Sequence, residues 1–228
     1  MIKNIFLDAG GVILNEDAFE NISANIITDI IKCFDRNYSV ENYRKDAEEA
    51  VYRYVPSVYD YILYKNIVNK NDFKELKIKY KEQLKEQNRF RLMDGIEDFL
   101  MRFSKAYNIG ILGQYGSGFK KYLEEENILK YFAFSETQDD YKITKPDTRY
   151  FEAVLKRYNC KAEESVMVGD RIDKDIIPAK LVGMKTIRVK AGLHKTQEPR
   201  TPDEMPDLTV DSIREIEPEM IKSMDHRT

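Results

Sequence analysis

Short apolar runs that end at acidic residues or glycines recur along the chain. Runs of four to six such residues, closed by turn-forming residues, are typical of buried strands that enter tight loops. Three of them stand out: Ile2 to Leu7 precedes Asp8, Asn108 to Leu112 precedes Gly113, and Ser165 to Val168 precedes Gly169-Asp170. The pattern predicts three strands with chemically useful residues at their carboxyl ends.

Helical periodicity separates these runs. It appears in two groups of apolar residues: Ile96, Phe99, Leu100 and Phe103, and then Tyr150, Phe151, Val154 and Leu155. Strands that alternate with amphipathic helices indicate a parallel sheet with helices on both faces. In such sheets ligands bind beyond the carboxyl ends of the strands.

The last fifth of the chain continues the sheet pattern. Gly183 is a helix stop, and Lys185 to Val189 alternates like a strand. Pro206 to Val210 reads as one more strand, with a short helix expected over Asp211 to Ile216. From Glu217 onward the chain is polar, and we expect it to fray.

Residues 15–94 have a different character, with no convincing strand and no glycine. Helical periodicity recurs in this stretch, for example at Val51, Tyr54 and Val58. We therefore expect a core domain of residues 1–14 and 95–228, interrupted by a helical domain of residues 15–94. Eight of the 15 tyrosines lie in the insertion. They either pack a small helical bundle, the interpretation we favour, or form an aromatic face for a ligand.

Composition narrows the class of protein. Hydrophobic residues make up 42% and charged residues 34%, as in globular chains, and the net charge of −3 gives no basic excess for nucleic acid. No apolar run approaches the ~18 residues of a membrane span, and the start of the chain lacks a signal-peptide pattern. The two cysteines form no disulfide framework. We expect a cytoplasmic protein with no nucleic-acid or membrane partner.

The candidate chemistry is that of phosphoryl transfer. This reaction needs an in-line nucleophile, a divalent metal and positive charge for the phosphate oxygens. Mg²⁺ prefers carboxylate oxygens. The chain offers Asp8 after one strand, Asp170 and Asp175 after another, and Lys145 before a helix.

Three segments, in this order, resemble the haloacid dehalogenase superfamily. IFLDAGGVIL at residues 5–14 is similar to its first motif, and Lys145-Pro146-Asp147 to its third. VMVGDRIDKDIIPAKLVGMKTIRV at residues 166–189 is similar to its fourth motif, in which Gly-Asp stands five residues before a second Asp. The resemblance implies a Rossmann-like α/β core with an inserted helical cap domain of type one.

The resemblance also implies roles for these residues. Asp8 would accept the phosphoryl group, and Lys145 would hold Asp8 and the phosphate. Mg²⁺ would bind to Asp8, Asp170 and the backbone carbonyl of Gly10, with Asp175 either a ligand or a support. The alternatives are a turn-capping role for Asp8, helix capping by the other two acids, and a surface position for Lys145 with Lys142 as its competitor.

Two positions depart from the family pattern. Gly10 stands where the family's phosphatases usually have an aspartate that protonates the leaving group. Gly113 stands where a serine or threonine usually binds phosphate. We expect the backbone N–H groups of Gly113 and Gln114 to bind phosphate instead, with Ser117 as a substitute if the loop folds back.

These observations lead to three functional hypotheses. The first is a Mg²⁺-dependent phosphatase of small phosphorylated metabolites. The second is a haloacid dehalogenase, which lacks the Gly-Asp metal ligand and is therefore disfavoured by Asp170. The third is a weakened family member that binds a phosphorylated ligand or a protein partner. The substrate and the oligomeric state stay open.

Overall fold

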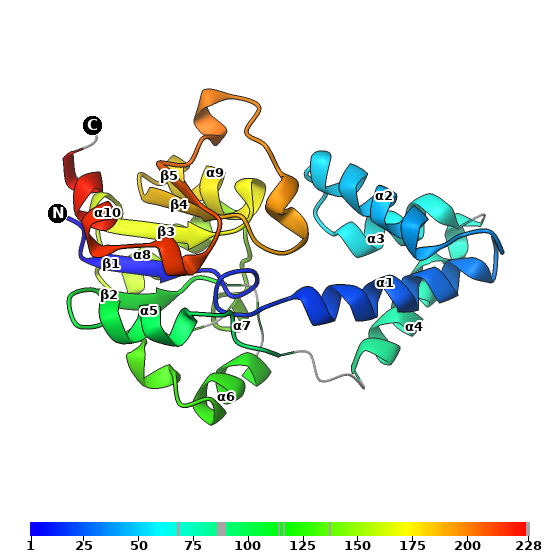
Figure 1. Ribbon diagram of the computed structural model, residues 1–228, viewed down its shortest axis with the longest axis horizontal. Helices are drawn as coiled ribbons and strands as arrows, with labels where there is room; N and C mark the ends of the chain where they lie inside the picture. Colours follow the sequence, from blue (N-terminus) through cyan, green and yellow to red (C-terminus); the bar gives the residue numbers. More distant parts are fainter. Residues whose placement is uncertain (68, 86–89, 114, 116, 137, 227–228) are drawn as a thin grey trace. The chain divides into compact units, whose positions relative to one another are not determined.

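A five-stranded parallel sheet in the order β2-β1-β3-β4-β5 organises the larger part of the chain (Figure 1). The computed structural model describes residues 1–228 except 68, 86–89, 114, 116, 137 and 227–228. The strands are β1 (Asn4–Leu7), β2 (Asn108–Ile111), β3 (Ser165–Gly169), β4 (Lys185–Val189) and β5 (Leu208–Val210). All five runs that we expected to be strands contain one, and the predicted parallel α/β class is confirmed.

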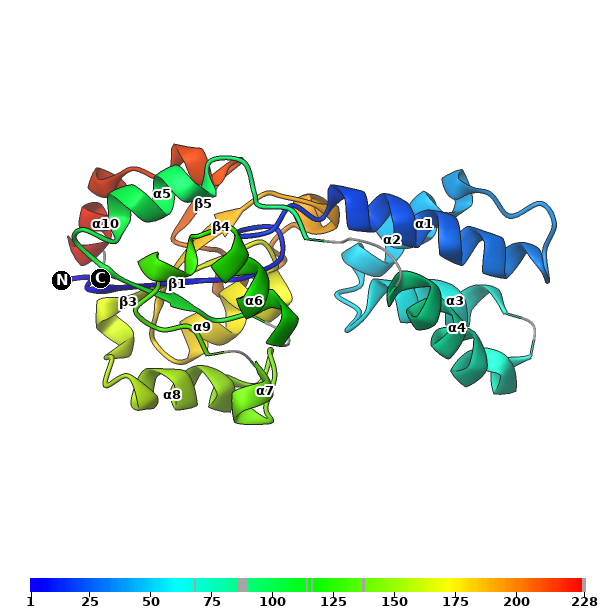
Figure 2. The same ribbon diagram turned by 90° about the horizontal axis from the view of Figure 1, so that it is seen from below.

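Successive side chains along the strands β1 and β3 point to opposite faces of the sheet. Ile5 and Val168 lie in a core cluster with Phe99, while Phe6 and Met167 lie in a second cluster on the opposite side. Helices cover both faces, with α5 and α10 on one side and α8 and α9 on the other (Figure 2). The helices of this unit are α5 (Ile96–Phe103), α6 (Ser117–Glu125), α7 (Gln138–Tyr141), α8 (Thr148–Arg157), α9 (Ile177–Leu181) and α10 (Pro218–Ser223).

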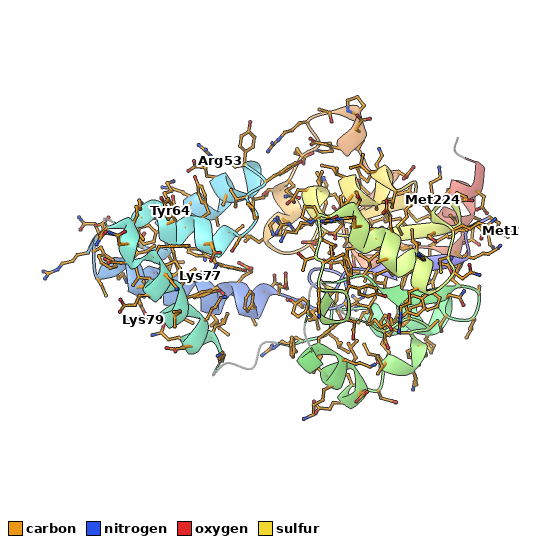
Figure 3. All side chains as sticks on the ribbon, turned by 180° about the vertical axis from the view of Figure 1, so that it is seen from behind. Met1, Arg53, Tyr64, Lys77, Lys79 and Met224 are labelled. Carbon is orange, nitrogen blue, oxygen red and sulfur yellow. The ribbon has the colours of Figure 1, made fainter. Side chains whose placement is uncertain are left out.

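The end of the chain differs from our expectation. As far as residue 226 the tail does not fray: α10 forms there, and both Ile221 and Met224 are fully buried. Asp225 accepts a hydrogen bond from the backbone of Ile2 at 2.6 Å, so this end of the chain lies beside the N-terminus (Figure 3). The tail is ordered although its composition is polar, because a few apolar residues lie on one side of it and are buried there. The helix expected over Asp211 to Ile216 is only a 3₁₀ turn, Ile213–Glu215.

The strand order creates a switch point between β1 and β3. β1 pairs with β2 on one side and with β3 on the other, and the chain runs outward in opposite directions from this pair. The backbone N–H of Asp8 donates to the carbonyl of Val168 at 2.9 Å, which joins the carboxyl ends of β1 and β3. Open parallel sheets bind ligands at such a point.

Glu16–Arg89 form a second compact unit, separate from the unit of Met1–Asn15 and Phe90–Thr228. It is helical: α1 (Asp17–Lys32), α2 (Val40–Tyr52), α3 (Val58–Asn66) and α4 (Phe73–Lys85). Ser39 and Ser57 cap the starts of α2 and α3 with their hydroxyls.

Three of the eight tyrosines of this helical unit are buried: Tyr38, Tyr43 and Tyr80. The rings of Tyr59 and Tyr80 pack 5.7 Å apart. Tyr52 and Tyr64 are exposed. In the part of the chain that the structure describes, no helix is long and apolar enough to cross a membrane.

Candidate active site at the ends of β1 and β3

Asp8 follows the last residue of β1 and lies at the switch point of the sheet. Its side chain is 12% exposed, so the carboxylate is largely buried and still reachable. The loop after it turns sharply, because the N–H groups of Ile13 and Leu14 both donate to the carbonyl of Ala9. The turn holds Asp8 at the end of the strand.

Glycine is required at position 11 of this turn. Gly11 has φ of +70°, and a Cβ there would lie 2.9 Å from Cβ of Asp170. The first loop can therefore close on the loop that follows β3. Gly10 is not among the glycines with positive φ, so its backbone is one that other residues can adopt.

Asp170 and Asp175 come from the turn after β3. Asp170 is buried, and Asp175 lies in the π-helix Ile172–Ile176. A Cβ at Gly169 would lie 2.3 Å from Cβ of Asp175, so this glycine lets the second acid pack against the strand end. The backbone N–H of Arg171 donates to Oδ2 of Asp175 at 3.0 Å.

The ammonium of Lys145 bridges the loop after β1 and the turn after β3. Its Nζ lies 2.6 Å from Oδ1 of Asp8 and also donates to Oδ1 of Asp175. Burial lowers the pKa of Lys145, but the carboxylates of Asp175 and Asp8 outweigh burial and raise it, so the ammonium persists at neutral pH. Lys142, the competing lysine, is exposed.

The carboxylates of Asp8, Asp170 and Asp175 lie together. Each offers an oxygen within 4.8 Å of the others, and all three residues are buried. Burial and then the charge of Asp8 raise the pKa of Asp175 to about 6. Three buried acids around one ammonium form a site of excess negative charge with hard oxygen donors, and this chemistry fits a divalent cation such as Mg²⁺.

The phosphate-binding positions are described only in part. A Cβ at Gly113 would lie 2.8 Å from Cβ of Ala9, so glycine is the residue that packs at this strand end. The carbonyl of Gly113 accepts a hydrogen bond from the hydroxyl of Tyr150 at 3.3 Å. Gln114 and the side chain of Ser117 lie outside the described residues.

Sequence patterns missed a network beside the acids. Gln197 is buried and hydrogen-bonds to Ile172 and Asp173. His194 is also buried, and burial followed by the charge of Arg171 lowers its pKa to about 3. No motif marks Gln197, because its partners Ile172 and Asp173 lie 25 and 24 residues away in the sequence.

The chain matches a known protein family and a curated relative. The family model of haloacid dehalogenase-like hydrolases matches residues 19–189. A glyceraldehyde 3-phosphate phosphatase of Methanocaldococcus jannaschii is 45% identical over 80 residues, which are 35% of this chain and 34% of that protein. The match thus spans about a third of the length of this curated relative.

Solved structures share the fold over nearly the whole chain. YfnB of Bacillus subtilis, solved with bound magnesium, has a TM-score of 0.68 at 19% identity and covers 99% of both chains. A 2-haloacid dehalogenase of Pseudomonas syringae has a TM-score of 0.60 at 17% identity, covering 98% of this chain and 99% of that one. A phosphatase and a dehalogenase are thus both among the proteins that this chain resembles. Because the family model covers most of the chain, this protein belongs to the haloacid dehalogenase-like hydrolases.

Proposed function

We propose that this protein is a Mg²⁺-dependent phosphatase of small phosphorylated metabolites that forms an aspartyl-phosphate on Asp8. The observation that carries the proposal is the buried group of Asp8, Asp170 and Asp175 at the switch point, with the ammonium of Lys145 paired to Asp8. A nucleophile, an acidic cation site and a fixed positive charge are the parts that phosphoryl transfer requires. The relative named glyceraldehyde 3-phosphate phosphatase supports the same class of substrate.

Asp8 acts in both halves of the reaction. One carboxylate oxygen attacks phosphorus, a new O–P bond forms, and the bond from phosphorus to the substrate oxygen breaks. Water then attacks the same phosphorus, the bond to Asp8 breaks, and phosphate and the free carboxylate are released while the water proton passes to solvent. Covalent catalysis of this kind divides one difficult displacement into two easier ones.

Lys145 orients the nucleophile and balances charge. Its contact with Oδ1 of Asp8 leaves the other carboxylate oxygen for the attack. A buried ammonium also stabilises the negative charge on the phosphoryl oxygens. Asp175 holds Lys145 in place from the far side.

Asp8, Asp170 and the carbonyl of Gly10 would hold Mg²⁺, and Asp175 would support them. The bound cation supplies charge neutralisation for the phosphoryl oxygens. Asp175 acts as a support because one of its oxygens faces Lys145 and the other faces the N–H of Arg171.

Gly10 determines how the leaving group is protonated. Position 10 offers no side-chain acid, so the leaving alkoxide takes its proton from water. General acid catalysis is typically worth roughly 10²- to 10⁴-fold in rate. Substrates with acidic leaving groups should therefore react faster than simple sugar phosphates.

A first assay separates the functional hypotheses. We expect p-nitrophenyl phosphate to be hydrolysed with Mg²⁺, and the activity to vanish in EDTA and return when Mg²⁺ is added back. Chloride release from 2-haloacids, undiminished by chelator, would instead support the dehalogenase. Binding of phosphorylated compounds without turnover would support the weakened family member. A panel of sugar phosphates, phospho-acids and nucleotides then identifies the substrate.

A further inference from the structure

Gln197 is a buried amide that connects two points of the acid-bearing turn. It is 1% exposed and follows the 3₁₀ turn Leu193–Thr196. Its Oε1 accepts a hydrogen bond from the backbone N–H of Ile172 at 2.8 Å, and its Nε2 donates to Oδ1 of Asp173 at 2.9 Å. Both partners lie between the two acids of the proposed cation site, Asp170 and Asp175.

We propose that Gln197 is a positioning residue for the cation site, which fixes the turn that carries Asp170 and Asp175. The inference rests on the proposed function, since it concerns Mg²⁺ at that site. Gln197 need not touch the cation or the substrate for this role.

The backbone N–H of Ile172 requires a hydrogen-bond acceptor from outside the turn. This residue opens the π-helix Ile172–Ile176, and the first N–H groups of a helix have no acceptor within it. Ile172 is fully buried, so water does not replace the lost acceptor. The amide oxygen of Gln197 satisfies this N–H and thereby holds the turn two residues after Asp170.

The second hydrogen bond of Gln197 positions a fourth carboxylate, that of Asp173. Asp173 pairs with the guanidinium of Arg171 at 2.6 Å and also accepts from Gln197. It is not among the three acids whose oxygens gather within 4.8 Å. Arg171 and Gln197 together hold Asp173 to one side, so that the cation site keeps its three-acid composition.

Gln197 is itself anchored to the sheet. Arg188 of β4 is buried and donates through Nη2 to the carbonyls of His194 and Lys195, at 3.2 and 3.4 Å. The backbone N–H of Gln197 donates to the same carbonyl of His194 at 3.0 Å. A continuous set of contacts therefore runs from β4 through the 3₁₀ turn to the acid-bearing turn.

Two substitutions test the role of the amide. Gln197→Met removes both hydrogen bonds at nearly constant volume, and Gln197→Asn keeps the amide but shortens its reach. Thr186→Val is the matched control: Thr186 is buried, and it exchanges two hydrogen bonds with Asp207 at the start of β4, the end opposite the acids. All three variants are compared with wild type in the full-length chain.

The readouts are Mg²⁺ affinity by isothermal titration calorimetry and the urea midpoint of unfolding. We expect Gln197→Met to weaken Mg²⁺ binding by about 10- to 100-fold, the usual effect of removing a residue that orients metal ligands. Gln197→Asn should weaken it in the same direction. Excess Mg²⁺ should restore most of the turnover of both variants. Thr186→Val should lower the urea midpoint and leave the Mg²⁺ affinity unchanged.

Two results would overturn the inference. Wild-type Mg²⁺ affinity in both Gln197 variants would show that the amide is not needed, and an equal loss in Thr186→Val would show that only general stability matters. If the wild-type chain binds no Mg²⁺, the proposed cation site is itself wrong and the inference falls with it. Mg²⁺ binding by wild type with unaffected Gln197 variants leaves the proposed function standing, so the two failures are distinguishable.

Discussion

At the scale of single residues, the ammonium of Lys145 holds the carboxylates of Asp8 and Asp175 next to each other. Asp8, Asp170 and Lys145 were predicted because each follows a strand or precedes a helix in a recognisable order, and the structure brings them together. Gln197 could not be predicted, because its role depends on how a distant loop folds back. The two oxygens of Asp175 are engaged by Lys145 and by the N–H of Arg171, a division that no motif specifies.

Asp170 and Asp175 should respond differently to the same isosteric change. Asp170→Asn should weaken Mg²⁺ binding by tenfold or more, with little loss of stability, because it removes one of three crowded carboxylates. Asp175→Asn should lower the free energy of unfolding by about 3 kcal/mol or more, because it removes one of the two buried acids paired with Lys145. Calorimetry and urea unfolding measure the two effects. The reverse ranking would make Asp175 the principal cation ligand.

Gly10→Asp tests the missing proton donor. Gly10 does not have a positive φ, so an aspartate there avoids the backbone strain that it would meet at position 11. We expect the variant to hydrolyse a sugar phosphate faster by up to roughly 10²-fold, and p-nitrophenyl phosphate little faster, because p-nitrophenolate leaves without a proton. Gly10→Asn is the control for shape. Equal gains from Asn and Asp, or on both substrates, would show that protonation does not limit this enzyme.

At the scale of secondary structure, strands were more predictable than the ends of the chain. Four of the strands lie within the predicted runs and β3 extends one residue further, to Gly169, because buried parallel strands are largely apolar segments that a sequence reveals. α10 was missed because only a few of its residues are apolar, and their burial depends on the sheet that they cover. The π-helix that carries Asp175 likewise depends on tertiary contacts.

Within the helical unit, Glu20 of α1 should make stability depend on pH. Burial and then the charges of Glu16 and Asp17 raise its pKa to about 7, although the hydrogen bond from Tyr59 opposes the shift. In the unfolded chain a glutamate titrates near 4.3. Between these pKa values the folded state binds more protons, so stability falls as pH rises and the full cost is present above about pH 7.

Glu20→Gln should remove that dependence. The stability of the variant relative to wild type should increase by up to about 3 kcal/mol between about pH 5 and pH 8.5. Urea unfolding at both pH values measures the difference. Glu75→Gln, at an exposed glutamate of α4, is the control and should show no such change. A constant difference between Glu20→Gln and wild type would mean that Glu20 is ionised throughout.

At the scale of the whole molecule, the fold and the chemistry were predictable to different degrees. The order of strands, helices and motifs was enough to predict the α/β class and the family, since these depend on the whole sequence. The substrate was not predictable, because a phosphatase and a dehalogenase are both among the proteins that this chain resembles. In the proposed function the activity depends on a few atoms around Asp8, so it has to be tested there.

Trapping the covalent intermediate tests the central claim most directly. The protein is mixed with substrate and Mg²⁺, quenched in acid within a single turnover, digested and sequenced by mass spectrometry, with Asp8→Asn in parallel. We predict one phosphoryl group on Asp8 in wild type, none in the variant, and a loss of several decades in turnover in the variant. A phosphoryl group on another residue, or an Asp8→Asn variant with more than about a tenth of wild-type activity, would contradict the account.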